Sequence, residues 1–416
     1  MTEIATDFTC TPALWADFRA LCGFGGRLCG TPSEDWARDH LAAALAAVAR
    51  AHGGTVSTLP MDYDGWTGGA AWLDLADGTR LAAEPLVGSP PVRDLDLAVV
   101  DLGRGGPDEA AANADRVPGA LVLARHEYMF STRTIHRSRK FAAAVERGAA
   151  AFAMVGPEPG RAVTGGANFG GPARVPAVGL APEAAARAAA AGRARLTVEA
   201  ATAPARTENL FLDLPGRSRE WVVISAHIDG HRLAQSAMDN ATGLAAALEA
   251  ARLLAPQVAG WRRGLRVCLY TLEEWGLMGS AHHLATQPAD AHRAVALDIN
   301  LDSVAGDPHL AAMTSGFPAL EPFLAGAAAG LGLELDFHRP LLRNSDHYNY
   351  AMAGIPAFRL VAGFERPESG LRFVLTDGDT VDRVDRTDLE RATRLVATVA
   401  ARACAGDEDF RIGAAP

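Results

Sequence analysis

Hydrophobic runs of different lengths divide the chain into three parts. The first part predicts a core-facing helix at residues 34–51, with its apolar positions at Trp36, Leu41, Leu45 and Val48. From about residue 66 to 203 the runs are short and broken by glycine and proline. This pattern of short apolar runs predicts a small β-rich unit with a helix or two, the clearest of them within residues 139–150.

After residue 203, buried strands alternate with long helices. Strands are expected at residues 221–227, 265–274 and 294–302, and helices at residues 243–255 and 387–403. This alternation predicts an α/β fold with a mixed, largely parallel sheet between helices. The middle part is then an insertion at residues 66–203 in a catalytic domain formed by residues 1–65 and 204–416.

Composition and charge exclude several classes of function. The 416 residues, 49% of them hydrophobic, can form two domains with a sizeable core. No signal peptide and no apolar run of about 18 residues is visible, so we expect no membrane partner. Five scattered cysteines without a C-x-x-C pair indicate a reduced, cytoplasmic protein. A net charge of -10 argues against a nucleic-acid partner, and the oligomeric state, a homo-oligomer included, stays open.

Titratable side chains lie at the ends of three predicted strands. They are His227 at the end of the first strand and Asp229 just beyond it, Asp239 in the turn that follows, Glu273 and Glu274 at the end of the second strand, and Asp302 at the end of the third. Open α/β sheets place their ligands at strand ends, so these groups are candidates for one site.

Each of these groups also has a simpler interpretation. A His-x-Asp pair can be a local hydrogen bond, adjacent glutamates a solvated turn, and a single aspartate a helix cap. Together, however, four carboxylates and an imidazole at neighbouring strand ends would repel one another unless a cation lay among them. The mixed set of ligands suits Zn²⁺ or Mn²⁺. One of the two adjacent glutamates can bind the ion while the other takes a proton from the activated water.

Several motifs in order resemble the co-catalytic zinc aminopeptidase family, which includes bacterial leucyl aminopeptidases, glutamate carboxypeptidase and glutaminyl cyclases. The motifs are HIDG…MDNATG, LEEWGLMGS, INLDSVAG and NSDHYNYAMAGIPAFRL, with GGRLCGTPSEDWARDHL near the N-terminus. The resemblance covers most of residues 25–60 and 205–400. The middle part is similar to the protease-associated domain that is often inserted in this family.

The resemblance implies a role for each matching residue. The metal ligands are His227, Asp239, Glu274 and Asp302, with Asp239 shared between two metals, and Glu273 is the general base. Asp229 orients His227, and Asn240 follows Asp239 through a cis peptide bond. Arg343, Asp346 and His347 are expected along the substrate pocket. His231 and Arg232 are candidates for substrate contact because they lie near the metal motif in the sequence.

The last motif of the family is incomplete in this chain. The family has His-Thr-x-x-Asp-Thr before the closing helix, whereas residues 375–380 read LTDGDT, so Leu375 stands where a metal ligand is missing. Three outcomes follow: one tightly bound metal, a second metal held by a substitute such as His231 or Asp377, or no catalysis. We expect the first, with one Zn²⁺ or Mn²⁺ per chain, because the ligands of the first metal and the Glu273 base are present.

The expected function is a metal-dependent hydrolase that acts on the C–N bond of a small molecule. The reaction would be deamination of an aromatic amine, as in nitroanthranilate aminohydrolase, or amide hydrolysis. An aminopeptidase or dipeptidase that acts on short peptides is the alternative, and a non-catalytic binding protein is the third class. Arg137 and its basic neighbours in the insertion are interpreted as a solvated helix face, with neutralisation of an anionic substrate as the alternative.

Overall fold

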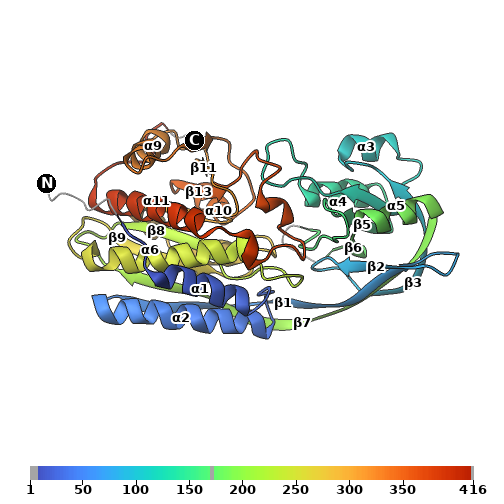
Figure 1. Cartoon of the computed structure of the whole chain (residues 1–416), viewed down its shortest axis with the longest axis horizontal. Helices are drawn as coiled ribbons and strands as arrows, with labels where there is room; N and C mark the ends of the chain where they lie inside the picture. The colour runs from blue at the N-terminus through green and yellow to red at the C-terminus, as the bar shows by residue number, and fades with distance from the viewer. Residues whose placement is uncertain (1–7, 169–172, 414–416) are drawn as a thin grey trace.

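A long antiparallel ribbon joins the two lobes of the molecule (Figure 1). The computed structural model describes residues 8–168 and 173–413. In the ribbon, β1 (Thr55–Asp74) pairs with β7 (Arg193–Leu214), so each strand has one end in the larger lobe and the other in the smaller lobe. Both strands continue without a break past residues 65 and 203, and the predicted domain boundaries therefore fall inside strands.

The larger lobe is built on a mixed sheet with the strand order β7-β9-β8-β10-β13-β11-β12. These strands are β8 (Trp221–His227), β9 (Gly264–Tyr270), β10 (Val295–Leu301), β11 (Leu310–Met313), β12 (Leu335–His338) and β13 (Ala357–Ala362). The central strands β9, β8, β10 and β13 are parallel, whereas β7 and β11 are antiparallel to their neighbours β9 and β13. The predicted mixed, largely parallel sheet is confirmed.

Helices cover both faces of this sheet. The helices of the larger lobe are α1 (Pro12–Gly23), α2 (Pro32–His52), α6 (Thr242–Val258), α7 (Met278–Thr286), α8 (Ala289–Ala294), α9 (Leu320–Gly330), α10 (His347–Met352) and α11 (Arg386–Ala405). Alternate residues of β8 point to opposite faces: Val222 belongs to the core that includes α6, whereas Val223 packs in a cluster with Leu284 of α7 and Tyr350 of α10. No helix in residues 8–168 or 173–413 is long and apolar enough to cross a membrane.

The smaller lobe has its own closed set of strand pairings. Its elements are β2 (Arg80–Pro85), β3 (Val92–Asp101), α3 (Pro107–Ala112), β4 (Leu121–Arg125), α4 (Arg137–Glu146), β5 (Ala151–Val155), β6 (Ala177–Leu180) and α5 (Pro182–Ala191). The pairings run β1-β2-β6-β5-β4-β3-β7 and close through β1 and β7. The sequence predicted a helix or two. The described part of this lobe contains α3 and α5 besides α4, and both are short and rich in alanine, which leaves little amphipathic pattern to detect.

Trp36 does not face the core as the sequence predicted. Its side chain is 55% exposed, whereas Leu41, Leu45 and Val48 are buried. Five residues separate Trp36 from Leu41, about 140° around a helix with 3.6 residues per turn. Ala37, four residues before Leu41, takes the buried position instead.

Candidate metal centre

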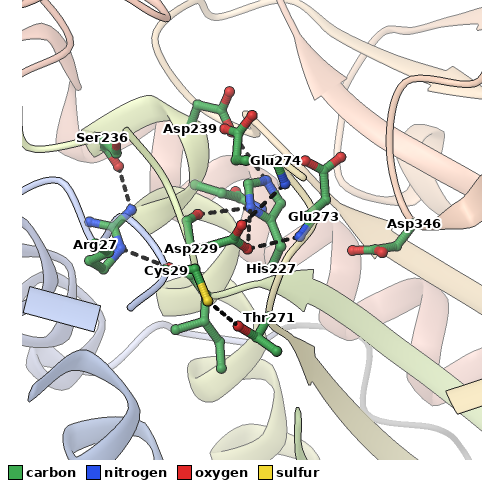
Figure 2. A network of polar contacts seen from close by, with 12 residues as sticks. Arg27, Cys29, His227, Asp229, Ser236, Asp239, Thr271, Glu273, Glu274 and Asp346 are labelled. Carbon is green, nitrogen blue, oxygen red and sulfur yellow. Dashed lines mark hydrogen bonds and ion pairs between the residues drawn. The ribbon is translucent and has the colours of Figure 1, made fainter. Parts of the chain in front are cut away.

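The carboxyl ends of three adjacent parallel strands bring the predicted ligands into one cluster. His227 is the last residue of β8, Asp302 follows β10, and Glu273 and Glu274 follow β9 after two intervening residues. Asp239 comes from a π-helical turn, η1 (Ala237–Ala241), directly before α6. Figure 2 shows the carboxylates of Asp239, Glu273 and Glu274 gathered around the imidazole of His227.

The first group of ligand atoms consists of His227, Asp239 and Asp302, all of them buried. Nε2 of His227 lies 3.1 Å from Oδ1 of Asp239 and 3.5 Å from Oδ1 of Asp302. This Nε2 atom and Oδ1 of Asp239 have no hydrogen-bond partner among the described residues. Burial of a polar atom without a hydrogen-bond partner is unfavourable, because its interaction with water is lost and not replaced. One imidazole and two carboxylates are ligands that suit a divalent cation such as zinc. These residues therefore fit the metal that the sequence predicted.

Asp229 supports the cluster through the backbone. Its two carboxylate oxygens each lie 3.1 Å from a donating backbone N–H, one from Glu273 and one from Glu274. Its carbonyl oxygen, rather than its carboxylate, is the close partner of His227, at 2.9 Å from Nδ1. Asp229 therefore positions both adjacent glutamates in addition to the histidine that the resemblance assigned to it. Burial raises the pKa of its carboxyl to about 7.

Asn240 ties the turn before α6 to the end of β10. The Asp239–Asn240 peptide bond is cis, as the resemblance implied. The Asn240 side chain donates to the carbonyl oxygen of Leu301 at 2.8 Å and accepts from the N–H of Gly243 at 3.0 Å. Asp239 is thereby held next to the strand that carries Asp302.

The adjacent glutamates have opposite pKa shifts. Burial, reinforced by the negative charges of Glu274 and Asp302, raises the pKa of Glu273 well above its usual value. Burial alone would raise the pKa of Glu274. The charge of the neighbouring His231 and its close contact with Glu274 have the opposite effect and are stronger, so the pKa of Glu274 is lowered. Glu273 therefore binds a proton more readily than Glu274, and their roles as base and metal ligand remain predictions.

A second group of ligand atoms consists of His231, Asp239 and Glu274. Asp239 belongs to both groups. Nε2 of His231 lies 2.5 Å from Oε1 of Glu274, and all three side chains are buried. The structure therefore places His231, which the sequence suggested as a substrate contact or a substitute ligand, among the candidate metal ligands.

The other predicted substrate contacts lie around this cluster. Arg232 forms an ion pair with Glu84 of the smaller lobe and donates to backbone carbonyls of β1. Arg343 is exposed, with its guanidinium 5.6 Å from the ring centre of Tyr348. Asp346, which accepts a hydrogen bond from Ser280, and His347 are both buried. Whether these residues contact a substrate remains a prediction.

Leu375 is buried in the main hydrophobic core. Its φ of 68° lies in the left-handed region, which is unusual for a leucine. Its carbonyl oxygen accepts the N–H of Thr164 from the smaller lobe at 2.8 Å. An aliphatic side chain offers no ligand atom at this position.

Two buried residues that the sequence analysis did not select position the cluster. Arg27 donates through Nε to the carbonyl of Ile228 at 3.0 Å, and through its terminal nitrogens to the carbonyls of Gln235 and Ser236, both at 2.8 Å. Asp379 accepts the N–H of Met238 at 2.8 Å. Arg27 lies in the GGRLCG motif near the N-terminus, which could be recognised in the sequence. The segment that Arg27 binds lies about 200 residues further along the chain, and no local pattern connects the two.

A pocket opens onto the cluster. Its lining includes Asp239, Glu273, Glu274, Asp302, Asn344 and Arg359 from the larger lobe and Met129, Phe130, His136, Arg137 and Ser138 from the smaller lobe. A second, more apolar pocket shares Glu274 and is lined by aromatic side chains of Tyr63, Trp66 and Trp275. The smaller lobe thus forms part of the wall of the site.

Comparisons with known proteins agree with this geometry. The model of peptidase family M28 matches residues 209–400. The probable lipoprotein aminopeptidase LpqL of Mycobacterium tuberculosis is 25% identical over 344 residues, which cover 74% of this chain and 67% of that protein. Leupeptin-inactivating enzyme 1 of Streptomyces exfoliatus is 28% identical over 194 residues, which cover 45% of this chain and 44% of that enzyme.

The fold also matches solved structures. A zinc aminopeptidase from Bacillus subtilis superposes on 95% of this chain, and on 95% of its own, with a TM-score of 0.76 and 20% sequence identity. At this identity the match establishes the fold, and the family model covers the site from His227 to Leu375. The chain has the fold of zinc aminopeptidases, and its residues 209–400 match the model of peptidase family M28.

Proposed function

We propose that the protein is a metal-dependent aminopeptidase that acts on short peptides with an apolar N-terminal residue. The observation that carries this proposal is the position of Glu273. This buried carboxylate lines the pocket, and one of its oxygens lies within 4.8 Å of ligand atoms of His227 and Glu274. A general base beside a metal cluster on a pocket wall is the arrangement that hydrolysis by activated water requires.

Peptide hydrolysis needs a water, a base and a proton for the leaving amine. A divalent cation held by His227, Asp239 and Asp302 would acidify the water and polarise the scissile carbonyl. Glu273 takes the proton as the water oxygen adds to the carbonyl carbon, and it returns that proton to the nitrogen as the C–N bond breaks. The raised pKa of Glu273 makes it a stronger base than a solvated carboxylate.

The two pockets support the choice of substrate. The aromatic-lined pocket next to Glu274 suits an apolar side chain at the N-terminal residue. Arg137 of the smaller lobe lines the other pocket and supplies the positive charge that a peptide carboxylate would meet. Two of the relatives named above, the probable lipoprotein aminopeptidase LpqL and the zinc aminopeptidase from Bacillus subtilis, support the same reaction class.

The small-molecule C–N hydrolase expected from the sequence finds no support among these relatives. It remains the alternative outcome of a substrate test, as does a non-catalytic binding protein. Zinc is the metal that the similar structure names, while manganese and a cytoplasmic location remain predictions.

A Glu273→Gln substitution tests the proposal. We expect kcat on leucine- and phenylalanine-initiated dipeptides to fall about 10²–10⁴-fold because the base is lost, while zinc content stays unchanged. Steady-state kinetics and metal analysis of the purified variant measure both quantities. Glu334→Gln, at an exposed glutamate, is the matched control.

Three results would contradict the proposal. Turnover of aryl amines but not of dipeptides would favour the small-molecule hydrolase. Undiminished turnover in Glu273→Gln would remove the assigned base. Absence of any metal-dependent turnover across both substrate classes would favour a binding protein.

A further inference from the structure

The loop after β8 carries His231, a histidine that is not among the metal ligands implied by the resemblance. We propose that His231 is the imidazole ligand of a second divalent cation, bound together with Asp239 and Glu274, and that it replaces the ligand missing at Leu375. This inference rests on the proposed metal-dependent function and adds to it the composition of the second metal site.

The contacts of His231 suit a metal ligand. Its Nε2 lies 2.5 Å from Oε1 of Glu274, yet neither atom has a hydrogen-bond partner of suitable geometry among the described residues. The ligand atoms of His231, Asp239 and Glu274 all lie within 4.8 Å of one another. The His231 side chain is 4% exposed, so water does not compensate for the missing partners.

The main chain holds His231 in this position before any ion binds. Its N–H donates to Oγ of Ser236 at 2.8 Å. Arg27 binds the carbonyls on both sides of the loop, at Ile228 and Ser236. A side chain at Gly26 would place a Cβ only 1.5 Å from the His231 carbonyl oxygen, so this close approach requires glycine.

The other substitute that the sequence suggested lies elsewhere. Asp377 is 55% exposed on its side chain and forms an ion pair with Arg161 of the smaller lobe. Leu375 is buried in the hydrophobic core. His231 is therefore the side chain near Glu274 that supplies the nitrogen ligand.

Charge balance favours an ion over a simple ion pair. Glu273, Glu274, Asp239 and Asp302 share the same buried region, and Arg359 compensates Asp302 at 3.1 Å. A protonated His231 would neutralise one further carboxylate but would leave Oδ1 of Asp239 without a partner. A cation between His231, Asp239 and Glu274 satisfies all three ligand atoms at once. The protein would then hold two ions rather than the one expected from the sequence.

Titration of the metal-free protein with Zn²⁺, followed by calorimetry and by metal analysis after dialysis, tests the inference. We expect two ions per chain in the unmodified protein and one in His231→Ala. The remaining ion should keep its affinity, whereas the second should weaken more than about 100-fold, because loss of even an indirect contact to a ligand costs about 10–100-fold. His52→Ala, which removes an exposed imidazole on α2, should retain both ions.

Two further variants separate a ligand from an ion-pair partner. Glu274→Gln should lose the same ion, and the double variant His231→Ala/Glu274→Gln should lose no more than either single variant. His231→Gln can still donate a hydrogen bond to Glu274, so recovery of full affinity for both ions in this variant would overturn the proposal. Circular dichroism and thermal unfolding establish that each variant is folded.

Manganese supplies a readout independent of activity. Two Mn²⁺ ions that share Asp239 should give an exchange-coupled electron paramagnetic resonance spectrum, and His231→Ala should give the spectrum of an isolated ion. One ion in both proteins would refute the role of His231 and leave the proposed hydrolase standing. No specific ion in either protein would refute the proposed function itself.

Discussion

At the scale of single residues, His283 is a buried imidazole away from the metal cluster. Its Nδ1 lies 2.8 Å from the hydroxyl of Tyr270, and its ring packs 4.7 Å from the ring of Phe211. Burial, with a smaller contribution from the positive charge of Arg266, lowers the pKa of His283 from 6.5 to about 4. The folded protein therefore keeps this side chain neutral in a range of pH where the unfolded chain protonates it.

This shift predicts a loss of stability in mild acid. As the pH falls from 6.5 towards 4, the unfolded state binds a proton at His283 that the folded state does not, so His283 destabilises the fold by about 2 kcal/mol at pH 5 relative to pH 7. His283→Gln retains a partner for Tyr270 without titrating. Urea unfolding at both pH values should show a smaller pH effect in the variant, and an equal effect would show that His283 is not the source.

At the scale of elements, the segment between β8 and α6 is held by a motif from the start of the chain. Arg27 is fully buried, and its guanidinium donates hydrogen bonds to backbone carbonyls of this segment. Asp379, from the loop before α11, binds the same segment through the N–H of Met238. Two distant parts of the sequence thus hold one loop that carries candidate ligands.

Removal of the Arg27 guanidinium should loosen this loop. In Arg27→Met the carbonyls of Ile228, Gln235 and Ser236 lose their donors, and we expect the free energy of unfolding to fall on the order of 3 kcal/mol. Zinc affinity at the His231 site should fall more than affinity at the His227 site, because His227 belongs to β8 rather than to the loop. Urea unfolding and zinc titration measure these effects, with the exposed Arg19→Met as control. Equal losses at both sites would contradict this account of the loop.

At the scale of the whole molecule, hydrogen bonds hold the smaller lobe next to the cluster of candidate metal ligands. The hydroxyl of Tyr128 donates to the carbonyl of Gly363 at 2.6 Å, and Glu365 accepts hydrogen bonds from Ser131 and Thr132. These contacts hold the segment that leads to Arg137 against the rim of the pocket. We therefore expect the lobe to contribute to substrate selection.

Arg137→Ala tests this contribution. We expect KM to rise about tenfold for a dipeptide with a free carboxylate and to change little for the same dipeptide with a C-terminal amide, because one charge-assisted hydrogen bond is worth about 1.5–3 kcal/mol when buried and less when solvated. Steady-state kinetics on the two substrates provide the comparison. Arg133→Ala, in the same segment but exposed, should leave both values unchanged. An equal rise for both substrates would argue against carboxylate recognition.

Local patterns were sufficient for much of the fold and of the cluster. The strands and helices after residue 203 were predicted because apolar periodicity is a property of residues close together in the sequence. The same strands place His227 and Asp302 at their carboxyl ends. The position of Trp36 was predicted incorrectly because it lies five residues from Leu41, and the short alanine-rich helices of the smaller lobe carry little periodicity.

The sequence alone determined the α/β architecture, the candidate ligands and the absence of a ligand side chain at Leu375. Only the tertiary structure decided that Arg27 holds the loop after β8, that Asp377 faces Arg161, and that His231 lies against Glu274. The reason is physical. Hydrophobic periodicity acts between neighbours in the chain, whereas these polar contacts form between residues that become neighbours only when the lobes and strands have packed.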